Sequence, residues 1–82
     1  VRVTGAVNTP SSLEYSQGMT VLDAVLEAGG ITEFANPGRA MLYRSTGESL
    51  PVALDRILRR GDMATNYQIG PGDTLTVPER AF

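Results

Sequence analysis

The side chains that could do chemistry in this sequence are arginines, carboxylates and tyrosines. The 82 residues include no cysteine and no histidine, so the commonest zinc ligands and the commonest general base are absent. All seven basic residues are arginine, which excludes Schiff-base chemistry on a lysine. No pair of carboxylates stands out as the acid and base of a glycosidase. We therefore predict no enzyme, no metal and no cofactor; catalysis would require an unusual Asp, Glu or Tyr site.

Two arginines flank a predicted strand and are candidates for binding. Arg39 and Arg44 are five positions apart, so strand alternation would point them to opposite faces. Each could contact a neighbouring subunit or a sugar acid. The alternative for each is a solvated arginine beside Glu33 or Glu48. A second basic group, formed by Arg56, Arg59 and Arg60, is better explained by a helix C-terminus, where cations complement the helix dipole.

The segment between these candidates and the preceding helix is a broken but stiff connector, residues 29–39. Gly29 and Gly30 can end a helix, and Pro37-Gly38 has the signature of a type II turn. Its first role is structural, to stop the helix and reverse the chain onto the next strand. A stiff connector would also hold Glu33, Asn36 and Arg39 at nearly fixed positions. We therefore predict that these three side chains present a surface.

The hydrophobic pattern predicts an α+β fold. Alternation and turn residues predict strands at 1–7, 11–16, 39–44, 49–54 and 74–78, with Pro51 on an edge strand. The clearest helix lies within 19–30, with Thr20 as its N-cap and Asp23 at the capping-box position. A short helix at 55–61 would carry an Asp55–Arg59 pair. Asp73 is interpreted as a turn residue that caps its own backbone. This order is that of a β-grasp (ubiquitin-like) mixed sheet with one main helix and a second short helix.

Charge and length limit the functions that remain. A net charge of −2 does not favour a nucleic-acid partner, and no apolar run is long enough to span a bilayer. The chain is expected to be a single domain, residues 1–82, cut from a longer protein because it starts inside a strand pattern. Ubiquitin-like modifiers end in Gly-Gly, and plant-type ferredoxins need four cysteines. Both features are missing from this sequence.

Several motifs in order resemble one β-grasp family. These are "VTGAV" followed by Pro10, then "GMTVLDAVLEAGGITEFAN", "RAMLYR", "PVALDRILRRGD", Asn66 and "IGPGDTLTVPER". Together they are similar to the soluble-ligand-binding β-grasp (SLBB) domain of outer-membrane polysaccharide export proteins. Ser11 departs from the glycine that often follows the first proline in that family, and the N-terminal export domain of such proteins is absent.

The resemblance implies a non-catalytic module on the periplasmic side of the outer membrane, in a ring-shaped conduit for exopolysaccharide or capsule. The partners would be other copies of the parent protein and the polysaccharide, with membrane association only through missing parts of the parent. The predicted contact residues are Glu33, Asn36, Arg39, Arg44 and Tyr67. Tyr67, like Tyr15 and Tyr43, could stack on a sugar ring or simply be half-buried. The alternative function is a stand-alone domain that binds a carbohydrate or another small molecule.

Overall fold

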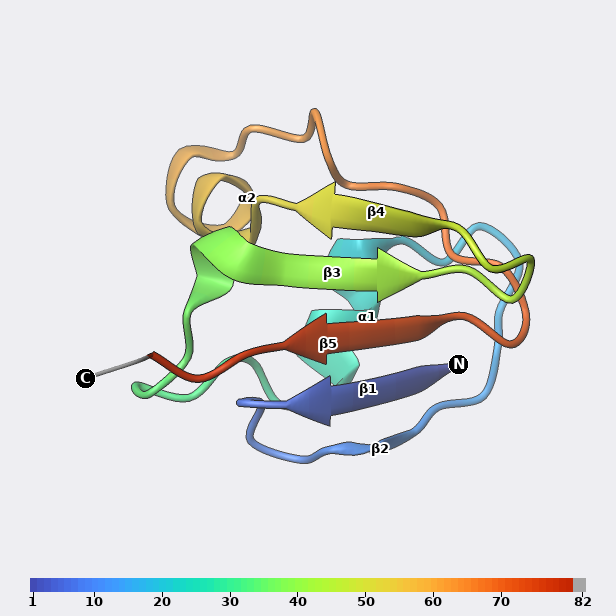
Figure 1. Ribbon diagram of the computed structural model, residues 1–82, viewed down its shortest axis with the longest axis horizontal. Coiled ribbons are helices and arrows are strands. Elements are labelled where there is room, and N and C mark those ends of the chain that lie inside the picture. The colour runs from blue at the N-terminus through green and yellow to red at the C-terminus, as the bar shows by residue number, and fades with distance from the viewer. Residues whose placement is uncertain (81–82) are drawn as a thin grey trace.

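Residues 1–80 are described by a computed structural model (Figure 1), so the last two residues of the predicted domain lie outside the described part. Its elements are β1 (Arg2–Gly5), β2 (Ser11–Ser12), α1 (Val21–Glu27), the 3₁₀ turn η1 (Pro37–Arg39), β3 (Ala40–Tyr43), β4 (Ser49–Val52), α2 (Leu54–Arg60) and β5 (Thr74–Val77). The five strands form one sheet in the order β2-β1-β5-β3-β4. β1 and β5 are parallel, and the other neighbouring pairs are antiparallel. This mixed sheet with two helices confirms the predicted α+β, β-grasp-like fold.

The main helix, α1, lies across one face of the sheet, behind the strands in the view of Figure 1. It buries one apolar side against the inward side chains of the strands. The residues that fill this interface are Val3, Leu42, Val52, Leu75 and Val77 from the sheet and Val21, Ala24, Val25 and Ala28 from the helix. Alternation in the strands and helical periodicity in α1 both bring their apolar residues to this single core.

Both ends of α1 are set by local sequence, as predicted. The Thr20 hydroxyl accepts from the Asp23 N–H at 3.4 Å, and the Asp23 carboxylate accepts from the Thr20 N–H at 3.0 Å. At the other end, the Gly30 N–H donates to the Val25 carbonyl at 2.9 Å. Gly29 has φ +80°, in the left-handed region that glycine reaches without steric cost. This is a Schellman-type helix end.

A glycine also fixes where β1 meets β5. Gly5 has φ +92°, and a Cβ at this position would collide with the main-chain oxygen of Val77 on β5. Because that oxygen also accepts from the Ala6 N–H at 2.7 Å, it cannot retreat without loss of a hydrogen bond. The close approach of β1 and β5 therefore requires glycine at this position.

Two strand predictions were too long. The predicted strand 11–16 pairs only through Ser11 and Ser12, because after Leu13 the chain leaves the sheet to reach the start of α1 (Figure 1). The predicted strand 49–54 stops at Val52, and α2 begins two residues later. Pro51 does lie on an edge strand, since β4 is the last strand of the sheet.

Two local interactions were predicted wrongly. Pro37 and Gly38 form the 3₁₀ turn η1, not a type II turn, and Gly38 has no positive φ. The Arg39 N–H donates to the Asn36 carbonyl at 3.1 Å. This hydrogen bond between residues three apart is the one that a right-handed 3₁₀ turn forms, and it needs no positive φ. The expected Asp55–Arg59 ion pair is absent from residues 1–80. Instead, the Asp55 carboxylate lies beside Gly38, 3.6 Å from where a Cβ on that residue would stand.

Candidate functional site

The connector that follows α1 is fixed on one side by the turn after β1. The Asn8 N–H donates to the Gly30 carbonyl at 3.0 Å, and the Thr32 N–H donates to the Ala6 carbonyl at 2.9 Å. The Asn8 side-chain amide donates to the Gly29 carbonyl as well. These bonds tie both ends of residues 29–32 to the turn after β1. The stiffness expected from glycine and proline content thus has a second source in main-chain hydrogen bonds.

The other side of the connector is fixed by the segment after β5. The Asn36 N–H donates to the Pro78 carbonyl at 2.7 Å, and the Arg80 N–H donates to the Phe34 carbonyl at 2.8 Å. The Arg80 guanidinium adds a bond from its Nε to the Ala35 carbonyl at 3.1 Å. Ala35 itself is buried. The connector is therefore held between two parts of the chain that are far apart in sequence.

The side chains that this fixed backbone presents form what we call the connector surface: Glu33, Phe34, Asn36 and Arg39. Glu33 and Arg39 are exposed, and Asn36 is half-buried with no side-chain bond to η1. Phe34 is 55% exposed, which is unusual for a large apolar ring on a backbone that is held by hydrogen bonds on both sides. Sequence reasoning noted Phe34 as apolar but did not select it, because exposure of one aromatic residue in a loop leaves no pattern in the sequence.

The other two predicted contact residues lie at the opposite end of β3. Arg44 is 26% exposed, and its Nη1 donates to Asp73 Oδ2 at 2.9 Å and to the Gln68 carbonyl at 2.8 Å. Tyr67 is half-buried and packs against the core. The structure therefore separates Arg44 and Tyr67 from Glu33, Asn36 and Arg39, which all lie on the connector. Neither Glu33 nor Glu48 is the carboxylate beside Arg44.

Asp73 is the centre of this second region. It is 2% exposed, and it accepts from the Gly70 N–H at 2.8 Å and from the Ser45 N–H at 3.0 Å in addition to Arg44. Burial by itself would raise the pKa of this carboxyl, but the hydrogen bonds from Gly70 and Ser45 and the Arg44 charge together hold it below its ordinary value. The predicted turn cap is confirmed, while the link to Arg44 and Ser45 was not predicted.

Asn66 is a further residue whose role sequence reasoning missed. Its Oδ1 accepts from the Leu22 N–H at 2.9 Å and so satisfies one of the free donors at the start of α1. The two residues are 44 positions apart. No local signal could have paired them, although Asn66 stands within the motifs that carried the family resemblance.

The chemistry available on these surfaces is recognition by hydrogen bonds, charge and apolar contact. No group of three or more potential metal ligands comes together within residues 1–80. In the part of the chain that is described, no helix is long and apolar enough to cross a membrane. The hollows on the surface are open and shallow, with volumes of about 210 to 300 Å³.

Comparison with known protein families gives one match that bears on these features. The model of the SLBB domain matches residues 1–53. The matched region contains β1, α1, the whole connector and the β3–β4 hairpin, so it includes every residue of the connector surface. It also covers more than half of the 82 residues. This chain therefore belongs to the SLBB domain family.

Proposed function

We propose that this domain is a non-catalytic assembly module of an outer-membrane polysaccharide export protein. It acts in the periplasm, where copies of the parent protein form a ring-shaped conduit and this domain supplies contacts between neighbours. SLBB domains are found in polysaccharide export proteins and are in general non-catalytic binding modules. The observation that carries the proposal is the connector surface, in which an exposed Phe34 stands on a backbone bonded from both sides.

A fixed aromatic side chain suits a contact between subunits for a physical reason. Aromatic residues and arginine are enriched where protein surfaces meet. A backbone that is already ordered loses little conformational entropy when a partner binds. Phe34 supplies apolar area, and the exposed Glu33 and Arg39 of the same connector supply charges of both signs. Such a contact is small, and a ring gains its persistence from many copies acting together.

The test is to count rings of the full-length parent protein by electron microscopy. Phe34→Ser and Arg39→Glu should each reduce the fraction of particles that are closed rings. Met63→Ser is the matched control for Phe34, because Met63 is a similarly exposed apolar residue outside the connector, at 48% exposure. Normal rings from both connector variants would overturn the proposal for this surface.

The presence of an exposed Phe34 on the same short connector as Asn36 and Arg39 also favours a second function, recognition of a carbohydrate. An aromatic ring can stack on the apolar face of a sugar while amide and guanidinium groups bind its hydroxyl or carboxyl groups. Titration of the chain with oligosaccharides, followed by NMR, distinguishes the two. Saturable shifts confined to residues 33–39 would favour this second function, while the assembly proposal expects none.

A further inference from the structure

The two helices expose side chains at matching positions but with opposite charge. Each helix has seven residues, and in both the first and fourth are buried while the third, sixth and seventh are exposed. We call the exposed positions of α1 the acidic face (Asp23, Leu26 and Glu27) and those of α2 the basic face (Arg56, Arg59 and Arg60). Positions separated by three and four residues lie side by side on a helix. The two faces therefore have the same spacing.

The basic face has no carboxylate partner within residues 1–80. The ion pair between Arg44 and Asp73 is the only one in this part of the chain, so the three guanidinium groups of α2 are unpaired there. Asp55 lines the same hollow, of about 210 Å³, but its carboxylate is turned to η1 as described above. Three exposed like charges in two helical turns repel one another. An external group of negative charge would relieve this repulsion.

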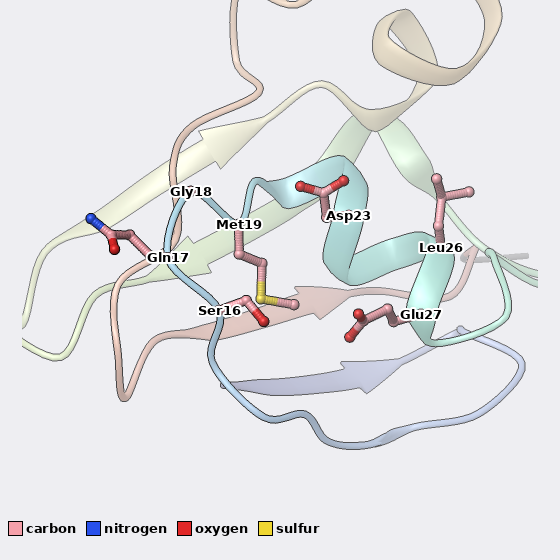
Figure 2. Close-up of a pocket in the computed structure, with 7 residues that line it drawn as sticks. All are labelled: Ser16, Gln17, Gly18, Met19, Asp23, Leu26 and Glu27. Atoms are coloured by element: carbon pink, nitrogen blue, oxygen red, sulfur yellow. The ribbon is translucent and has the colours of Figure 1, made fainter.

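The acidic face borders a hollow that is lined by Asp23, Glu27 and apolar side chains. Figure 2 shows Asp23, Leu26 and Glu27 on α1, with Met19 reaching from the preceding loop toward the space between the two carboxylates. The hollow measures about 300 Å³. Asp23 Oδ2 accepts from Thr20, whereas no residue of the described chain donates to Asp23 Oδ1 or to Glu27. Apolar walls beside free carboxylate oxygens match the methylene stem and charged head of arginine.

We propose that the basic face of α2 in one copy of this chain binds the acidic face of α1 in the next copy. The two helices run antiparallel, so that Arg60 lies opposite Asp23 and Arg56 lies opposite Glu27. This orientation also places the positive end of each helix dipole beside the negative end of the other. The inference rests on the proposed function, because it names the partner surface through which neighbouring copies meet.

The arrangement has a geometric consequence. Because the two faces are different, each copy in a pair keeps one face unused, and a further copy can add to it. Contacts of this head-to-tail type close into a ring when the rotation between neighbours permits and otherwise form an open chain. Exposed charge pairs are weak and are screened by salt. A single contact should then form only at about millimolar concentration and low ionic strength, with the ring supplying avidity.

The test uses two variants that each reverse one charge on a different face. Glu27→Arg disrupts the acidic face, Arg60→Glu disrupts the basic face, and each variant keeps the other face intact. Because Arg60 lies opposite Asp23 and not opposite Glu27, the two altered faces do not complement each other. In NMR spectra of the 82-residue chain at low salt, wild-type signals from both helices should shift with concentration. Each variant alone should lose this dependence, with a dissociation constant raised roughly tenfold, since like charges now face each other. An equimolar mixture of the two variants should regain binding through the one intact pair of faces.

Isotope labelling of one component makes the result specific. In the mixture, labelled Glu27→Arg should show shifts on α2, and labelled Arg60→Glu should show shifts on α1. Glu48→Arg mixed with Arg2→Glu is the matched control, because these exposed residues lie outside both faces, and each should behave as wild type. If Glu27→Arg loses the dispersed spectrum of a folded chain, Glu27→Lys replaces it, with the same expectation.

Three results would overturn the inference. The first is a mixture that shows no gain over the separate variants. The second is a set of wild-type shifts that cluster at residues 33–39 and persist in both helix variants; copies then associate through the connector, and the proposed function stands without this contact. The third is an oligogalacturonate that shifts the α2 arginine signals while the mixture shows no binding, which would make the basic face a site for acidic glycans. Normal rings from the connector variants described above would instead count against the proposed function.

Discussion

The two ends of β3 hold their neighbouring segments in different ways. After Tyr43, the chain is held by side-chain charge: Asp73 is buried and accepts from Arg44 and from two main-chain N–H groups. Before Ala40, the connector is held by main-chain bonds to the turn after β1 and to the segment after β5. The side chains of Arg44 and Asp73 are engaged in the first case, whereas the side chains of Glu33, Asn36 and Arg39 make no hydrogen bond or ion pair within residues 1–80. The comparison indicates which end of β3 is available to a partner.

The largest expected effect is at the buried carboxylate. Asp73→Ala removes the acceptor for the Gly70 and Ser45 N–H groups and leaves the Arg44 charge without its partner. Loss of hydrogen bonds to a buried charged group should lower the free energy of unfolding by about 3 kcal/mol. Urea denaturation measures this, with Glu48→Ala, at an exposed residue of the β3–β4 turn, as control. Equal urea midpoints for Asp73→Ala and Glu48→Ala would mean that the Asp73 carboxylate does not hold the chain after β3.

The pH dependence should follow from the same carboxyl. Its pKa is lowered in the folded state, so the ionised form stabilises the fold. This contribution is complete above the unfolded pKa of about 4 and is lost as the pH falls through the folded pKa. The stability difference between wild type and Asp73→Asn should therefore shrink on acidification below about pH 4. Denaturation at a series of pH values tests this; a difference that grows in acid would contradict the assignment.

A smaller effect on the free energy of unfolding is expected from removal of the arginine at either end of β3. Arg44→Ala should reduce the free energy of unfolding by about 1 kcal/mol, a value discounted because the side chain is 26% exposed and partly screened by water. Arg39→Ala should have no measurable effect, because no hydrogen bond or ion pair of its side chain exists within residues 1–80. The predicted role of Arg44 as a subunit contact stays a prediction. Thermal unfolding of both variants measures this difference. Equal melting temperatures would contradict the expectation that Arg44 contributes to stability and Arg39 does not.

Much of the fold could be predicted because its signals are local. The capping box of Thr20 and Asp23 spans one helical turn, and the alternation around Leu75 and Val77 is visible within a single strand. The match between motif order and a known family then supplied the topology. Asp73 was correctly interpreted as a cap because the carboxylate and its Gly70 donor are three residues apart.

What sequence reasoning missed is long-range. The Arg44–Asp73 pair joins residues 29 positions apart, and Asn66 reaches across 44 positions to the start of α1. Composition could not reveal that Arg80 would hold the connector, or that Phe34 would remain exposed on it. The 3₁₀ turn at Pro37 replaced a type II turn because glycine permits, but does not require, positive φ.

The smallest expected effect on stability, and the one most informative about function, is at Phe34. Phe34→Ser keeps the two main-chain bonds of this residue, from its N–H to the Thr32 hydroxyl at 3.3 Å and from the Arg80 N–H to its carbonyl at 2.8 Å. Because the ring is already 55% exposed, its removal should change the free energy of unfolding by no more than about 0.5 kcal/mol. Urea denaturation of the chain measures this beside Met63→Ser. A loss of about 2 kcal/mol or more, the size seen for buried side chains, would mean that Phe34 packs inward, and that the connector serves the fold more than a partner. An unchanged free energy of unfolding, together with fewer closed rings of the parent protein, would show that Phe34 serves a contact between subunits and not the stability of the domain.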